Sequence, residues 1–84
     1  MKIVWDEPKR IANLEKHGLN FADVDVFKWE SATITQSHSG RMKAIGNLNG
    51  RLTVVVYSPR GREAISLVSL RPANFKERRV HEEE

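Results

Sequence analysis

The chain has 84 residues, of which 39% are hydrophobic and 30% charged, a composition typical of one globular domain spanning residues 1–84 and not of a disordered or fibrous protein. No apolar run approaches the roughly 18 residues of a membrane helix, and the start "MKIVWDEP" lacks the apolar part of a signal peptide, so we expect a cytoplasmic protein without membrane contact. There is no cysteine, which excludes disulfides and thiolate metal sites, and the three histidines do not have ligand spacing. We therefore expect neither a metal nor a cofactor.

The net charge of +3 is distributed unevenly along the chain. Residues 1–30 carry a net charge of −1, residues 31–81 carry +7, and residues 82–84 carry −3. Clustered cations gain free energy by releasing counterions from a phosphate backbone. The basic second half therefore indicates a polyanionic partner, without identifying it.

The first elements are a short strand, "KIVW", followed by a helix that starts after Asp6 and ends at Gly18. The helix should carry one apolar row with a histidine at its end: Ile11, Leu14 and His17. We expect His17 to pack in the core or to interact with the helix C-terminus. A second, short helix should run from Asn20 to about Trp29, because phenylalanine and valine recur there at a spacing of three.

The period then changes to two, which is typical of strands. The four strand segments are 31–36, 41–46, 51–58 and 62–71. Asn49-Gly50 and the Pro-Gly turn at residues 58–61 are hairpin signals, so consecutive strands should be antiparallel.

A last helix should begin at Asn74, which stands at capping-box spacing from Glu77, and should run into the terminal glutamates. The expected fold is α+β, with an antiparallel sheet of about four strands, two N-terminal helices and a C-terminal helix. If the helices lie on one face, the other face is left partly open and basic.

The chain lacks a Gly-rich phosphate loop, a nucleophile elbow, a Cys/His pair and a carboxylate cluster for Mg²⁺. Its inventory suits RNA cleavage by the RNA's own 2′-hydroxyl, in which arginines stabilise the phosphorane and a side chain moves the proton. The candidates for catalysis are Arg71, Arg60, Tyr57 and His81. The candidates for RNA binding are Arg62, Arg78, Arg79, Lys76 and Lys43.

Each candidate also has a structural interpretation. The turn arginines and the arginines of the last helix suit a solvated surface at least as well as a phosphate contact. Tyr57 can pack its ring at a strand end, and His81 can be ordinary helix surface. Arg71 is better placed, because it ends a strand and would project from a rigid element.

The chain resembles the BrnT family, small ribonuclease toxins of type II toxin-antitoxin systems with a RelE-like fold. The segments that carry the resemblance are "WDEPKRIANLEKHGLNFADVDVF" (5–27), "AIG" (44–46), "GRLTVVVYSPRG" (50–61) and "VSLRPANFKERRVHE" (68–82). The resemblance implies a metal-independent endoribonuclease that inhibits translation. It also implies a partner, a BrnA-type antitoxin with a ribbon-helix-helix domain, and a homodimer or a hetero-oligomer with that antitoxin.

By position, Arg71 matches the arginine of the family's ending motif, Arg60 lies in the basic turn before it, and the basic helix follows. Two positions depart from the family: Ser66 stands where arginine is common, and His81 where tyrosine is common. One alternative is a non-catalytic basic module that only binds a partner protein or nucleic acid. Another is a toxin homologue that has lost its activity through these two departures.

Overall fold

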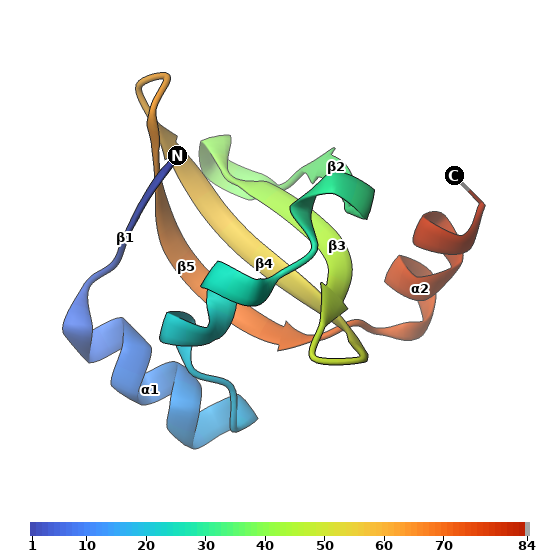
Figure 1. Ribbon diagram of the computed structural model, residues 1–84, viewed down its shortest axis with the longest axis horizontal. Coiled ribbons are helices and arrows are strands. Elements are labelled where there is room, and N and C mark those ends of the chain that lie inside the picture. The colour runs from blue at the N-terminus through green and yellow to red at the C-terminus, as the bar shows by residue number, and fades with distance from the viewer. Residues whose placement is uncertain (84) are drawn as a thin grey trace.

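The computed structural model describes residues 1–83, built around one five-stranded sheet with the strand order β1-β5-β4-β3-β2 (Figure 1). The strands are Lys2–Val4 (β1), Thr33–Gln36 (β2), Met42–Leu48 (β3), Arg51–Arg60 (β4) and Ala64–Pro72 (β5). The α-helices are Glu7–His17 (α1) and Phe75–Glu82 (α2), and the 3-10 helices are Phe21–Val26 (η1), Trp29–Ser31 (η2) and His38–Gly40 (η3). The α+β class is thus confirmed.

The expectation of a four-stranded antiparallel sheet is wrong. The first strand, β1, pairs in parallel with the start of β5, with Ile3 opposite Ile65, so the sheet has five strands and is mixed. Strand β1 has only three residues and is not part of a hairpin, so nothing in its sequence indicates which strand it pairs with. That pairing depends on the path of the chain between β1 and β5. The antiparallel pairing of β2, β3, β4 and β5 agrees with the prediction.

Both hairpins form, with one shift. Asn49 and Gly50 have φ of 52° and 84°, the left-handed pair that a tight two-residue turn requires. The second turn begins later than predicted, because β4 continues through Pro59 to Arg60. Proline is tolerated there because β3 pairs with β4 only up to Tyr57, leaving that side of the strand open.

The capping residues of the helices were predicted correctly, but the length and type of the second helix were not. Gly18 ends α1 with φ of 70°, and its N–H binds the carbonyl of Leu14. The predicted second helix is instead two short 3-10 segments, η1 and η2, although Asn20 caps the first of them as expected. The capping box of α2 is present, and of the glutamates predicted to follow, Glu84 lies outside the described residues.

The main cluster of the hydrophobic core lies on one face of the sheet, under the segment that contains η1 and η2. Phe21, Val24 and Phe27 of this segment are fully or almost fully buried against β3, β4 and β5. Trp29 joins Phe27 to Tyr57 through edge-to-face contacts, with ring centroids 4.9 and 5.7 Å apart. The face opposite carries α2, because Lys43, which alternates with the core residue Ala44 on β3, reaches Glu77 of that helix.

The first helix does not present its predicted apolar row to the core. Ile11 and Leu14 are 46% and 39% exposed, whereas Asn13 is buried. Helix α1 lies along the outer edge of β5, beside β1 (Figure 1). There the Asn13 side chain donates to the Leu70 carbonyl at 2.8 Å and accepts from the Leu70 N–H at 3.0 Å. The carboxamide of Asn13 thus satisfies the backbone hydrogen bonds of Leu70 that a neighbouring strand would otherwise make at this part of the sheet edge.

Gly46 on β3 permits the close approach of Phe27 and Ala32, which follow η1 and η2, to the sheet. A Cβ atom at this position would lie 2.8 Å from Cζ of Phe27 and 3.1 Å from Cβ of Ala32. We expect Gly46→Val to lower the free energy of unfolding by about 1–3 kcal/mol through overpacking. Urea denaturation measures the effect, with Gln36→Val on the exposed edge strand as a control within about 0.5 kcal/mol of wild type. Unchanged stability of Gly46→Val would contradict this packing.

Candidate functional site

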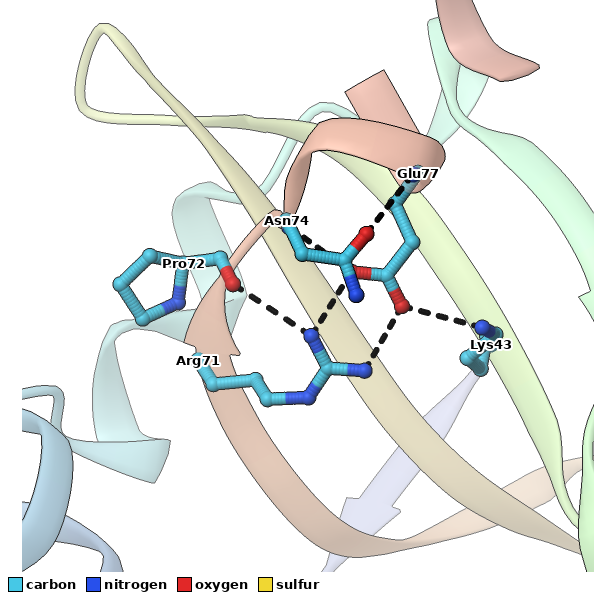
Figure 2. Close-up of polar contacts among 5 residues, drawn as sticks. All are labelled: Lys43, Arg71, Pro72, Asn74 and Glu77. Atoms are coloured by element: carbon cyan, nitrogen blue, oxygen red, sulfur yellow. Dashed lines mark hydrogen bonds and ion pairs between the residues drawn. The ribbon is translucent and has the colours of Figure 1, made fainter. Parts of the chain in front are cut away.

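Arg71 and Glu77 form the central ion pair between β5 and α2 (Figure 2). Two guanidinium nitrogens of Arg71 each donate to one carboxylate oxygen of Glu77, both at 2.7 Å. Lys43 adds an ammonium at 3.0 Å from β3, and the backbone N–H of Asn74 donates at 2.9 Å. The Glu77 side chain is only 5% exposed, so this carboxylate is surrounded by donors from three elements. It fastens α2 to the sheet.

The cluster of Arg71, Lys43 and Glu77 has two cations for one anion. The hydrogen bonds from Arg71 lower the pKa of Glu77 to about 2, against the opposing effect of burial, and Asn74 and Lys43 add to the lowering. The same bonds to Glu77 raise the pKa of Arg71. At neutral pH the cluster therefore keeps a net positive charge. The shortest hydrogen bonds of the guanidinium go to Glu77.

The two arginines predicted to hold one phosphate lie at opposite ends of the β4–β5 hairpin, Arg60 at the end of β4 and Arg71 near the end of β5. Arg60 pairs with Ala64 and Arg71 lies seven residues further along the strand, which separates the two backbone positions by about 23 Å. Arg60 and Arg62 are exposed at the β4–β5 turn, at the far end of the hairpin in Figure 1. The structure therefore does not bring them together with Arg71.

The two candidates for proton transfer lie on opposite faces of the sheet. Tyr57 is 9% exposed on the core face, where burial raises the pKa of its phenol. His81 is half-buried on α2, with Nδ1 2.9 Å from Oγ1 of Thr33. The remaining basic candidates of α2 are exposed, and one of them, Arg79, pairs with Glu83 at 3.6 Å. The exposed candidates are Lys76, Arg78 and Arg79.

A pocket of about 230 Å³ lies between α1 and β5, where the sequence predicts no site. Its lining residues are Lys9, Ala12, Asn13, Lys16, His17, Val68 and Ser69. Partial burial lowers the pKa of His17, and the charges of Lys16 and Arg71 lower it further. The signal in the sequence was the spacing of residues 9, 13, 16 and 17, which share one face of a helix. It was obscured by the competing apolar spacing of Ile11 and Leu14.

Within residues 1–83, no three His, Asp or Glu side chains are grouped so that they could hold a metal ion. None of the described helices is long and apolar enough to cross a membrane.

The family match and the structural match both indicate the same protein family. The family described as "Ribonuclease toxin, BrnT, of type II toxin-antitoxin system" matches residues 5–77. The crystal structure of the Brucella abortus ribonuclease toxin BrnT is similar to this fold with a TM-score of 0.78 and 44% sequence identity, over 88% of this chain and 97% of that one. No curated protein sequence matches the chain significantly. Because the family match covers most of the chain and the fold agrees with it, this protein belongs to the BrnT family of ribonuclease toxins of type II toxin-antitoxin systems.

Proposed function

We propose that the chain is an endoribonuclease that cleaves RNA without a metal ion, through attack of the RNA's own 2′-hydroxyl, and so inhibits translation. Family membership supports the class of activity. The observation that carries the proposal is the cationic cluster of Arg71 and Lys43, which keeps one net positive charge on the α2 face of the sheet after Glu77 is paired. Such a charge can stabilise the phosphorane that forms when the 2′-oxygen attacks.

Arg71 retains donors for this task. A guanidinium carries five N–H donors, and those of Arg71 that are in use go to Glu77 and, at 3.4 Å, to the Pro72 carbonyl. Its side chain is 28% exposed, so a phosphate can approach it. Because Glu77 fixes its orientation, the guanidinium is already held in place before RNA binds.

The other basic candidates are proposed to contact further phosphates of the same strand. Arg60 and Arg62 would bind the strand at the β4–β5 turn, and the exposed cations of α2 would bind it at the opposite end. Proton transfer by Tyr57 or His81 stays a prediction. Tyr57 lies on the core face, opposite the Arg71 cluster, and since its raised pKa keeps the phenol protonated, only the role of the acid is open to it.

The wider setting follows the family. Membership of a type II system supports an antitoxin as protein partner. We propose that this antitoxin is of the BrnA type with a ribbon-helix-helix domain, that the two form a hetero-oligomer, and that residues 1–84 are one RelE-like domain. Inhibition of translation would place the toxin's action in the cytoplasm.

Two variants that break the same ion pair test the role of Arg71. Arg71→Ala removes the cation and should slow RNA cleavage at least about 100-fold, whereas Glu77→Gln keeps the cation, loses only the orientation that the carboxylate supplies, and should retain more of the cleavage. Cleavage is followed with EDTA present, with and without ribosomes, at a temperature where circular dichroism shows both variants folded. Equal loss in both variants would reduce Arg71 to a structural role, and wild-type rates in Arg71→Ala would refute the assignment.

A non-catalytic RNA-binding module remains the second candidate, because the pairing of Arg71 with Glu77 also suits a purely structural anchor for α2. A wild-type protein that binds RNA and leaves it intact under every condition of the same assay would establish this alternative.

A further inference from the structure

The pocket between α1 and β5 combines a fixed floor with several cations, and the proposed function has not used it. We propose that this pocket binds the phosphate beside the scissile bond, and that His17 takes the proton from the attacking 2′-hydroxyl. This inference rests on the proposed ribonuclease activity and adds to it the base and a phosphate subsite.

The floor of the pocket is held by Asn13. Its amide nitrogen donates to the carbonyls of Leu70 at 2.8 Å and Leu19 at 3.0 Å, while its oxygen accepts from the Leu70 N–H at 3.0 Å. The Ser69 hydroxyl also donates to this oxygen, at 3.4 Å. These bonds join α1, the loop after it and β5, so His17 in the last turn of α1 has a fixed position relative to the strand.

A bulge in β5 sets which side chains face the pocket. Val56 pairs with Ser69 and Tyr57 pairs with Leu67, which leaves Val68 as the extra residue. Beyond this bulge, Ser69 and Arg71 are two residues apart and point to the same face of the sheet. Bulges of this kind often lie beside active sites, where they redirect side chains. Arg71 thus follows the lining residue Ser69 on the same face, and its charge acts on His17, so the pocket lies next to the proposed phosphorane site.

The charges around the pocket favour an anion. Lys9 and Lys16 line it from α1, Arg71 acts on it from β5, and none of its lining residues among the described part of the chain is acidic. A volume of about 230 Å³ lies below the roughly 300–1,000 Å³ of pockets for drug-sized ligands, which suits a phosphate with its sugar. A phosphodiester of RNA supplies the missing negative charge.

The chemistry of His17 suits a base. Partial burial and the neighbouring cations favour the neutral imidazole, which has a free lone pair near neutral pH. The imidazole removes the proton of the 2′-hydroxyl, the 2′-oxygen forms a bond to phosphorus, and the bond from phosphorus to the 5′-oxygen breaks. The leaving 5′-oxygen takes a proton from water, and the imidazolium releases its proton to solvent. The products are a 2′,3′-cyclic phosphate and a 5′-hydroxyl end.

Single-turnover cleavage as a function of pH tests the base. Wild type should cleave faster as the pH rises through the pKa of His17, and His17→Gln should lose that rise together with at least about 100-fold in rate. The matched control, His38→Gln in the exposed η3 segment, should follow wild type. A wild-type profile in His17→Gln would overturn the proposal, as would loss of the rise in His81→Gln instead.

Binding tests the subsite separately from cleavage. A 2′-O-methyl RNA oligonucleotide, which cannot be cut, should shift the ring resonances of His17 in an NMR titration and leave those of His38 in place. Lys16→Ala should weaken binding and reduce the salt dependence by about one phosphate contact, whereas Lys28→Ala should not. Shifts confined to other histidines would place the RNA elsewhere and overturn the subsite.

The two experiments separate the inference from the function beneath it. If wild type and His17→Gln cleave RNA equally, the proposed function stands and the role of His17 falls. If wild type cleaves no RNA with or without ribosomes, both the proposed function and the proton transfer by His17 are refuted. The NMR titration then still shows whether the pocket binds a phosphate.

Discussion

Replacing Glu77 by glutamine is expected to lower the free energy of unfolding by about 3 kcal/mol at pH 7. Glutamine keeps the size of the side chain and can still complete the capping box, so the change isolates the lost charge. It leaves Arg71 and Lys43 beside each other without the carboxylate that now lies between them. Their side chains are 28% and 26% exposed, which allows some solvation and places the loss at the lower end for a buried pair.

Urea denaturation measures this difference, with Glu83→Gln as the matched control. Glu83, the C-cap residue of α2, also forms an ion pair, with Arg79, but its side chain is 70% exposed and the two charged atoms are 3.6 Å apart. Its removal should change the free energy of unfolding by less than about 0.5 kcal/mol. If both variants unfold at the same urea concentration, the cluster at Glu77 does not stabilise the fold as the geometry implies.

The contribution of Glu77 should depend on pH with a definite sign. Its pKa is about 2 in the folded state against 4.5 for an unperturbed glutamate, so its stabilisation is complete above about pH 4.5 and is lost as the pH falls towards 2. A difference of about 2.5 pKa units corresponds to roughly 3 kcal/mol, which agrees with the estimate for the substitution. Wild type and Glu77→Gln should therefore converge in stability near pH 2. A constant gap across this range would contradict the assignment.

Asn13→Leu is expected to cost roughly 3 kcal/mol of unfolding free energy, because it leaves the N–H and carbonyl of Leu70 and the carbonyl of Leu19 without their partner. Leucine has a similar volume, so the loss comes from hydrogen bonds and not from a cavity. Chemical denaturation measures the cost, and amide hydrogen exchange should show the Leu70 N–H exchanging much faster than in wild type.

Glu15→Leu is the control for this substitution, since Glu15 is exposed on the same helix. It should stay within about 0.5 kcal/mol of wild type and leave the Leu70 amide protected. Unchanged protection of that amide in Asn13→Leu would show that the edge of β5 is closed by another group.

Local chemistry explains the parts of the fold that were predicted correctly. Asn49-Gly50 requires left-handed backbone, Gly18 ends a helix by the same property, and Asn74 with Glu77 forms a capping box. Each of these signals acts within four residues. The parallel pairing of β1 and the 3-10 geometry of η1 depend instead on contacts with distant segments. Local secondary-structure propensities carry no information on such contacts.

The candidate site divides in the same way. Arg71 was recognised because it ends an apolar strand and matches a family motif, but the sequence assigned Glu77 only to a helix cap. The structure adds that Glu77 is also the buried partner of that arginine. The separation of Arg60 from Arg71 follows from the number of residues in the β4–β5 hairpin, which can be counted in the sequence. That number corresponds to a long distance only because the residues form extended strands.

By itself, the sequence determined the family, the α+β class, the hairpins and the basic second half of the chain, because these depend on residue types, their order and local backbone preferences. Only the tertiary structure decided that α1 turns Asn13 and not its apolar row towards the sheet, that α2 is anchored on the face opposite the main core cluster, and that His17 lies in a pocket where the charge of Arg71 acts on it. The physical reason is that burial and charge pairing depend on the distance between segments far apart in the chain, and folding alone sets that distance.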